Sequence, residues 1–185
     1  MLAHDLAHAR PRRIRRAEYD RMAQLGFFRG ERVELIRGTV VAMSPIGPPH
    51  SSVVDRLTRL LVRALDPRAL VRIQQPFLAH DESEPEPDVA VVPDGLYADA
   101  HPDRAFLIIE VAESSLDYER EAKAPLYAAS GVDEYWIVDV AARSIEVYSH
   151  PVNGRYRSLR TVDEDGSVTI AAFPDVTIEV ATLFA

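Results

Sequence analysis

Three short runs in this chain are apolar at nearly every position, and they limit the folds open to it. The runs are "DVAVV" at residues 88–92, "AFLIIEV" at 105–111 and "EYWIVDV" at 134–140. A strand with one wetted face alternates apolar and polar residues, so an unbroken apolar run of this length indicates burial on both faces. The runs therefore predict the central strands of a sheet that other elements cover on both sides.

Helix, hairpin and strand patterns surround these runs. Residues 50–65 repeat apolar side chains at i, i+3, i+4 and i+7, which predicts an amphipathic helix. Residues 17–28 and 117–130 favour two further helices, and Pro125 predicts a kink or a late start in the second of them. The further predicted strands are the hairpin at 32–45 around Arg37-Gly38, residues 69–79, and four closing strands after residue 143 with turns at Asn153-Gly154 and Asp165-Gly166.

The bulk composition fits one globular domain. The chain has 185 residues, of which 47% are hydrophobic, and this is enough for a proper core. No run approaches the ~20 apolar residues of a membrane span, and no apolar stretch typical of a secretory signal follows the first charges. The absence of cysteine excludes disulfides, thiolate catalysis and the usual zinc ligands. We therefore expect a cytoplasmic protein with no membrane partner.

The charge is distributed unevenly along the chain. The net charge is −8, yet residues 1–16 contain five arginines and one aspartate. This predicts a basic arm at 1–16, which is either a solvated tail or an arm that contacts phosphate groups, followed by a single domain at 17–185. The acidic residues at 81–86 fit a solvated loop. The acidic body either avoids nucleic acid or gathers carboxylates around a cation.

Two carboxylates interrupt the buried runs. Asp88 opens "DVAVV" and Glu110 stands near the end of "AFLIIEV". A buried carboxylate is costly unless it is paired or coordinated. If the two strands are antiparallel neighbours with Val92 opposite Phe106, Asp88 stands opposite Glu110 at one end of the sheet. Glu34, in the first hairpin, is a third acid between apolar residues.

Such a cluster requires compensation. Carboxylates within ~4–6 Å of each other repel by roughly 1–4 kcal/mol per pair, so the cluster needs a proton, an arginine or a metal ion. Crowding also predicts that at least one of the acids has a raised pKa without metal. Oxygen ligands alone favour Mg²⁺ or Mn²⁺. The alternative is that each acid pairs with one of the twenty arginines.

The chain contains a single lysine, Lys123, among those arginines. Lysine is a compact charge whose pKa shifts on burial, whereas arginine is effectively always protonated. Beside metal-bound carboxylates, a lysine can orient an attacking water and support its deprotonation. The single lysine therefore predicts that position 123 has a role that arginine cannot fill. The alternative is that Lys123 is a surface lysine present by chance.

Several of these segments together resemble a known family. They are "EPEPDVAVV", "LIIEVAESSLDYEREAKAPLYAASGVDEYWIVD", and "VELIRGTVVAMSP" with His50 behind it. They resemble the Uma-two-type restriction endonuclease family of the PD-(D/E)XK nuclease superfamily over roughly residues 17–150. The resemblance implies a restriction-endonuclease-like α/β (α+β) fold, with a mixed central sheet flanked by helices, an N-terminal hairpin and extra C-terminal strands. It also implies a metal-dependent phosphodiesterase site.

The resemblance assigns roles to individual positions. Pro87-Asp88 matches "PD", and Glu110 matches "(D/E)". The superfamily lysine belongs two residues after the glutamate, where this chain has Ala112. The resemblance implies that Lys123, on the following helix, replaces it. Glu34 is then the additional acid from the first hairpin.

The roles of the neighbouring residues remain open at this point. His50 either supports the site or caps its helix, and Asp117 is more simply a helix cap than a support for the acids. Tyr127 shares a helix face with Lys123, so it either orients the lysine or packs in the core. Candidate contacts to nucleic-acid phosphates are Arg56, Arg59 and Arg63.

We therefore expect an endonuclease that uses Mg²⁺ or Mn²⁺ to hydrolyse nucleic-acid phosphodiester bonds, with DNA as the substrate. Asp88, Glu110 and Glu34 hold the metal, and Lys123 orients the attacking water. A homodimer suits double-strand cutting. The alternatives are a non-catalytic module that binds nucleic acid or protein, a hydrolase of small phosphoesters, and a structural protein whose acids all pair with arginine.

Overall fold

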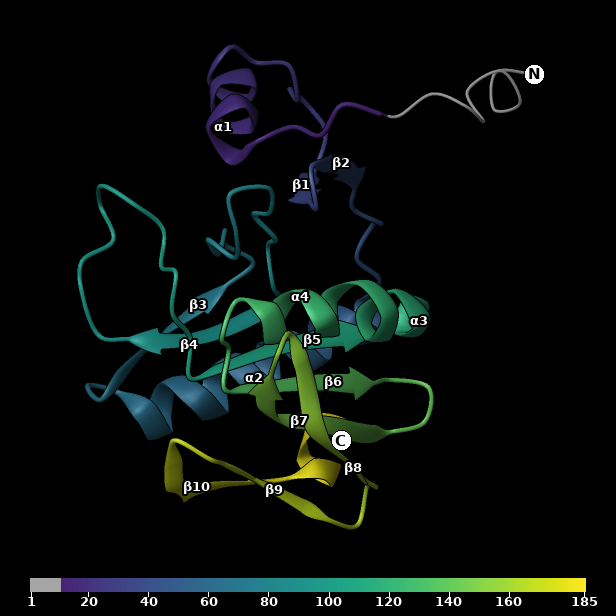
Figure 1. Cartoon of the computed structure of the whole chain (residues 1–185). Helices are drawn as coiled ribbons and strands as arrows, with labels where there is room; N and C mark the ends of the chain where they lie inside the picture. Colours follow the sequence, from purple (N-terminus) through teal and green to yellow (C-terminus); the bar gives the residue numbers. More distant parts are fainter. Residues whose placement is uncertain (1–10) are drawn as a thin grey trace. The chain divides into compact units, whose positions relative to one another are not determined.

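The computed structural model describes residues 11–185, which belong to two compact units (Figure 1). The first unit contains the described residues up to 44 and residues 80–85; the second contains residues 45–79 and 86–185. The helical elements are α1 (Arg16–Gln24), α2 (Pro48–Leu65), α3 (Leu116–Tyr118), the π-helical turn η1 (Glu119–Lys123), α4 (Ala124–Ala129) and the 3-10 turn η2 (Val180–Leu183). Among residues 11–185, no helix has both the length and the apolar character needed to cross a bilayer.

The strands are ten in number within the described residues. They are β1 (Val33–Ile36), β2 (Thr39–Ala42), β3 (Ala69–Ile73), β4 (Val89–Pro93), β5 (Leu107–Ala112), β6 (Glu134–Asp139), β7 (Ser144–Val152), β8 (Arg155–Val162), β9 (Ser167–Ile170) and β10 (Phe173–Glu179).

The first unit packs α1 against the predicted hairpin. β1 and β2 are antiparallel around a turn in which Arg37 and Gly38 both have positive φ, so the hairpin prediction is confirmed. Tyr19 of α1 packs on Val33 and Leu35, and its hydroxyl donates to the Val33 carbonyl over 2.9 Å. This small apolar cluster is the core of the unit.

Ion pairs connect the arm and the acidic loop within the first unit. The described arginines of the predicted arm all face acids, in the pairs Arg12–Glu18, Arg13–Glu82 (3.2 Å), Arg15–Asp81 (3.8 Å) and Arg16–Glu84 (4.0 Å). The prediction of a solvated acidic loop is wrong for Glu84, which is buried and forms a β-bridge with Leu35. Arg10 and Asp5 of the predicted arm lie outside the described residues.

The second unit is built on a mixed six-stranded sheet in the order β3-β4-β5-β6-β7-β8. Only β5 and β6 run parallel; the other neighbours are antiparallel. Val89 stands opposite Ile109 and Val91 opposite Leu107, so the predicted register of β4 and β5 is confirmed. The α/β (α+β) class with a mixed central sheet, N-terminal hairpin and extra C-terminal strands is confirmed as well.

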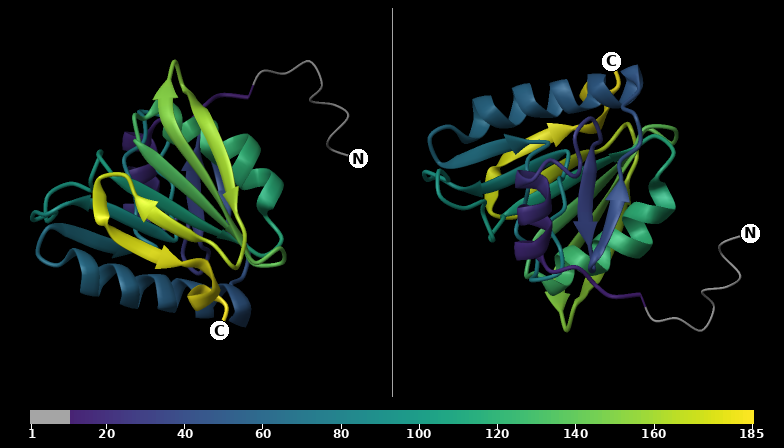
Figure 2. Two further views of the ribbon diagram at one scale, coloured as in Figure 1. Left: turned by 90° about the horizontal axis from the view of Figure 1, so that it is seen from below. Right: turned by 90° about the horizontal axis from the view of Figure 1, so that it is seen from above.

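Both faces of the central strands are covered, as their unbroken apolar composition requires. Figure 2 shows α2 and the yellow β9–β10 pair along one face and the green segment from α3 to α4 along the other. Leu57 and Leu61 of α2 pack on Val89 and Ile109 in the larger core. On the opposite face, the Tyr127 ring of α4 lies 5.1 Å from the Tyr135 ring of β6.

Two boundaries differ from the sequence patterns. β3 ends at Ile73 because Gln74 adopts φ +49°, and Pro76 follows it. The helix predicted at 117–130 is three segments, and the π-helical turn η1 ends two residues before Pro125. Proline lacks an N–H donor, and a wider turn accommodates its ring where a regular turn would clash.

Candidate active site

Two hydrogen bonds from backbone amides to carboxylates connect Asp88 with Glu110 and with the next residue, Val111. The Asp88 amide donates to Glu110 Oε2 over 3.2 Å, and the Val111 amide donates to Asp88 Oδ2 over 2.9 Å. Both side chains are buried, with exposed fractions of 8% for Asp88 and 3% for Glu110. The register of β4 and β5 creates this pair, because it sets residue 88 opposite residue 110.

Lys123 and Tyr127 both donate to one oxygen of Glu110. Lys123 Nζ lies 2.9 Å from Oε1, and the Tyr127 hydroxyl lies 2.7 Å from the same atom. Lys123 is 3% exposed, and Tyr127 is fully buried. Residues four apart on a helix share a face, so both side chains reach the same carboxylate. The structure therefore confirms the prediction that Tyr127 packs in the core. It also shows a direct hydrogen bond from Tyr127 to Glu110.

The helical segment that carries Lys123 is locally widened. The Ala124 amide donates to the Glu119 carbonyl five residues back, which is the π-helical pattern. Within η1, Glu119 and Lys123 are both buried, whereas Arg120 is exposed and pairs with Glu146 of β7. Such turns recur at functional sites because they redirect side chains of a helix. Here the turn ends at the one lysine of the chain.

Asp88 receives two further side-chain donors. His50 Nε2 lies 2.9 Å from Asp88 Oδ2, and Gln74 Nε2 lies 3.1 Å from Oδ1. The alternative that His50 caps its helix is wrong, because Gly47 is the N-cap of α2 and the imidazole faces Asp88. His50 therefore contacts one of the two central carboxylates directly.

These donors keep Asp88 ionised. Burial by itself raises the pKa of Asp88, but the hydrogen bond and charge of His50, with the Val111 amide and Gln74, outweigh it and lower the pKa. The crowding of acids that the sequence indicates therefore does not raise the pKa at Asp88. An ionised, oriented carboxylate is the form that binds a metal ion.

The remaining candidates are Glu34, Asp117 and three arginines of α2. Glu34 is buried on β1 of the first unit, and its part in the site stays a prediction. Asp117 is exposed, Ser115 is the N-cap of α3, and within residues 11–185 no hydrogen bond joins Asp117 to the carboxylates, so the capping prediction is wrong. On α2, Arg59 and Arg63 are exposed, and Arg56 donates to the Thr182 carbonyl over 3.1 Å.

Sequence patterns missed Gln74. Its amide donates to the Asp88 carbonyl over 3.2 Å, in addition to the side-chain hydrogen bond. A positive φ at a non-glycine residue is uncommon and often marks a functional position. The signal that could have found it is the register of β3 and β4, which sets Ile73 opposite Val89 and hence a polar residue beside Asp88.

The donor set can be compared with what a divalent ion requires. Across residues 11–185, no group of three or more His, Cys, Asp or Glu side chains forms a ready-made metal cage. Mg²⁺ is usually held by one or two carboxylates, with water and substrate phosphate completing an octahedron. Asp88 and Glu110 supply such a pair of carboxylates, so these residues fit Mg²⁺ or Mn²⁺ in a substrate-assisted site.

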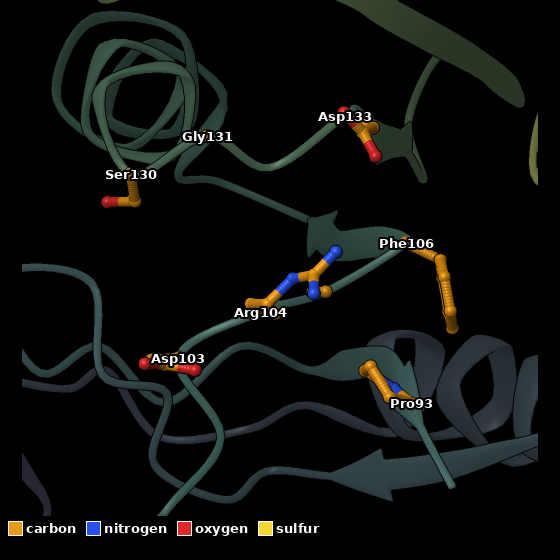
Figure 3. Close-up of a pocket in the computed structure, with 8 residues that line it drawn as sticks. Pro93, Asp103, Arg104, Phe106, Ser130, Gly131 and Asp133 are labelled. Carbon is orange, nitrogen blue, oxygen red and sulfur yellow. The ribbon is translucent and has the colours of Figure 1, made fainter.

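A small cavity of about 120 Å³ lies at the other ends of the same strands. Pro93 ends β4 and Phe106 precedes β5, so this cavity is remote along both strands from Asp88 and Glu110. Figure 3 shows the exposed side chains of Asp103, Arg104 and Asp133 around it. None of the residues that carry the carboxylate site lines this cavity.

Substituting Tyr127→Phe tests the donor on Glu110. The variant removes a 2.7 Å hydrogen bond to a buried carboxylate, and we expect it to lower the free energy of unfolding by about 1.5–3 kcal/mol, measured in urea. Tyr135→Phe is the matched control, because among residues 11–185 that buried hydroxyl makes only two long contacts of 3.4 Å, both to Glu119. Equal losses in the two variants would contradict a special contact between Tyr127 and Glu110.

Comparisons with known proteins found a matching family and a similar solved structure. A family model named Uma2 and described as "Putative restriction endonuclease" matches residues 16–181. A solved structure, described as "a putative nuclease belonging to DUF820 from Anabaena variabilis ATCC 29413", has a TM-score of 0.74. It is 16% identical, and the match covers 92% of this chain and 97% of that one, so it shows a shared fold. No curated protein matches this chain.

Proposed function

The chain belongs to the Uma2 family, and from that premise we propose that it hydrolyses phosphodiester bonds of nucleic acid with the help of Mg²⁺ or Mn²⁺. Asp88 and Glu110 hold the ion, and Lys123 acts beside it. The observation that carries the proposal is the buried cluster of three charged side chains from β5, η1 and the residue before β4.

A purely structural role accounts poorly for this cluster. Buried ion pairs are seldom more stabilising than well-packed apolar residues, so stability alone gives little reason to keep one. Two carboxylates and one ammonium also leave one negative charge over on Asp88, Glu110 and Lys123, which His50, 2.9 Å from Asp88, balances only in its protonated form. A divalent cation compensates that excess, and every side-chain atom that the two acids offer it is oxygen, as Mg²⁺ and Mn²⁺ prefer.

Each residue of the cluster has a defined task in the proposal. When bound, the ion polarises a phosphate oxygen and lowers the pKa of a coordinated water. His50, Gln74 and the Val111 amide keep the Asp88 carboxylate ionised and oriented. Tyr127 fixes Glu110, and Lys123 orients the attacking water and stabilises negative charge that develops on the phosphate.

The finer parts of the proposal concern partners. We propose DNA as the substrate and a homodimer as the assembly, because double-strand cutting needs two sites and symmetric dimers are the commonest oligomers. Arg59 and Arg63, exposed one turn apart on α2, and the neighbouring Arg56 would contact phosphates. Glu34 is proposed as a third acid from β1.

Cleavage of end-labelled oligonucleotides tests the proposed function. We expect single- or double-stranded DNA to be cut in Mg²⁺ or Mn²⁺ and to remain intact in EDTA, with RNA as a parallel substrate. Bis-p-nitrophenyl phosphate serves as a small phosphodiester in the same buffer. Hydrolysis of that compound without competition from oligonucleotides would favour a small-phosphoester hydrolase, and binding of DNA without cleavage would favour a non-catalytic module.

A further inference from the structure

Arg72 is a buried cation in the middle of β3. Its exposed fraction is 8%, and within residues 11–185 no acid forms an ion pair with it. Its guanidinium makes one hydrogen bond there, a long one of 3.3 Å between Nη2 and His101 Nδ1. Its Nε is buried and has no partner among the described residues. Burial removes water from the guanidinium and lowers the pKa of Arg72.

Another arginine four residues away provides a matched comparison. The Arg68 guanidinium lies 5.3 Å from the centre of the Phe173 ring, and the Arg72 guanidinium lies 5.5 Å from that of Tyr97. Arg68, however, also binds both oxygens of the Asp175 carboxylate at 2.9 and 3.0 Å. Stacking on an aromatic ring is therefore common to both arginines, and they differ because Arg72 has no carboxylate partner among the described residues.

Arg72 lies on the face of the sheet that carries the active site. Val71 and Ile73 pack against the core on the α2 side, so the alternation of β3 turns Arg72 to the opposite face. Gln74, two residues further, binds Asp88, which sets Arg72 about 7 Å along the strand from the carboxylate row. β3 is also the edge strand of this sheet as the described residues form it.

The donor geometry of Arg72 suits a phosphate group. Nε–H and one Nη–H of a guanidinium form a parallel pair that binds two oxygens of a phosphate or carboxylate at once. Among the described residues, Arg72 Nε has no partner, and Nη2 has only its long contact to His101. The loop at residues 94–104 covers this group, and most of that loop is exposed, including His101 itself.

We propose that Arg72 binds a non-scissile phosphate of the nucleic-acid strand whose scissile phosphate lies at Asp88 and Glu110. This subsite rests on the proposed function for its substrate class. The bound phosphate takes the Nε donor and replaces His101 at Nη2, while Tyr97 keeps the guanidinium plane in place. In an acidic chain, such a dedicated cation holds the strand in register without a broad basic surface.

Oligonucleotide affinity as a function of salt tests the subsite. Binding to a DNA duplex is measured in EDTA, so that cleavage does not interfere, for wild type, Arg72→Met and Arg68→Met. We expect Arg72→Met to weaken binding roughly tenfold and to reduce the slope of log K against log salt by about 0.9, the value for one lost phosphate contact. Arg68→Met should change neither quantity. An unchanged slope in Arg72→Met would overturn the subsite.

A second measurement avoids the risk that Arg72→Met folds poorly. In wild-type protein, the ¹H–¹⁵N resonance of Arg72 Nε is followed by NMR during titration with the duplex and, separately, with inorganic phosphate. We expect it to shift downfield with both ligands while the Arg68 resonance stays in place. No shift with either ligand overturns the subsite.

The two ligands separate the subsite from the proposed function. A shift with phosphate alone, together with no DNA binding and no cleavage, keeps an oxyanion site at Arg72 and overturns the nucleic-acid assignment. Cleavage of DNA by a protein whose Arg72 resonance never moves overturns the subsite and leaves the proposed function standing.

Discussion

Replacing Asp88 by alanine is expected to abolish the binding of Mn²⁺ and Mg²⁺. Asp88 is one of only two carboxylates in the cluster, and it is the one that His50, Gln74 and the Val111 amide keep ionised. Substitutions that act only through a ligand's surroundings typically cost 10–100-fold in metal affinity, so loss of a ligand should exceed about 100-fold. Titration calorimetry with each ion measures the affinity without any assumption about the substrate.

Two further variants make the result interpretable. Alanine leaves the Val111 amide without its acceptor, which costs about 1–3 kcal/mol of stability, so circular dichroism must show that the variant is folded. Asp88→Asn keeps the shape and one acceptor oxygen but loses the charge, and it should also fail to bind. Asp117→Ala removes an exposed acid of α3 and should bind like wild type. Unchanged Mn²⁺ affinity in Asp88→Ala would contradict the metal assignment.

The wild-type protein could also bind neither ion in this titration, and a second titration would then be needed. Two carboxylates hold Mg²⁺ weakly unless a phosphate completes the coordination, so the titration would then be repeated with DNA present. Binding that appears only with DNA would support the substrate-assisted site. Its continued absence would move the binding-module and structural alternatives ahead of the enzyme.

Lys123→Arg is expected to lose activity nearly as fully as Lys123→Ala. The ammonium is buried and lies 2.9 Å from Glu110 Oε1, in a segment whose neighbours Ala124 and Tyr127 are buried too. A guanidinium is larger, so it overpacks this space, and it stays protonated, so it cannot accept a proton from an attacking water. Loss of such proton-transfer and orienting roles typically lowers rates by about 10²–10⁴-fold.

Single-turnover cleavage rates in saturating Mn²⁺ measure this effect apart from metal affinity. Arg120→Lys is a useful control, because Arg120 belongs to the same π-helical turn but is exposed and pairs with Glu146. It should retain the wild-type rate. A fully active Lys123→Arg variant would show that positive charge alone suffices and that the identity of the chain's one lysine has no catalytic cause.

Much of the framework follows from local patterns in the chain. The runs that are apolar at nearly every position identify β4, β5 and β6, because only strands covered on both faces lack the alternation of apolar and polar residues. The acids within the first two runs then stand opposite each other once an antiparallel register is chosen, and that register is the one observed. The pairing of Asp88 with Glu110 could thus be predicted from the sequence alone.

The residues that surround this pair were harder to predict from the sequence. Tyr127 could orient Lys123 or pack in the core, and His50 could cap its helix or support the site. The choice depends on which side chains from separate elements come together. Gln74 gave no signal of its own, because its contact with Asp88 requires β3 beside β4 and a positive φ at its own backbone. Asp117 resembled a cap, yet the helix begins one residue earlier than predicted, at Leu116, with Ser115 as its cap.

The amino-acid sequence by itself determined the buried strands, the carboxylate pair and the singular lysine, because burial periodicity and residue chemistry are properties of neighbouring residues. Only the tertiary structure decided which donors meet those carboxylates. His50 at the start of α2, Gln74 after β3 and Lys123 at the end of η1 reach the pair from three elements. The packing of helices on both sheet faces sets those contacts, and no local pattern encodes them.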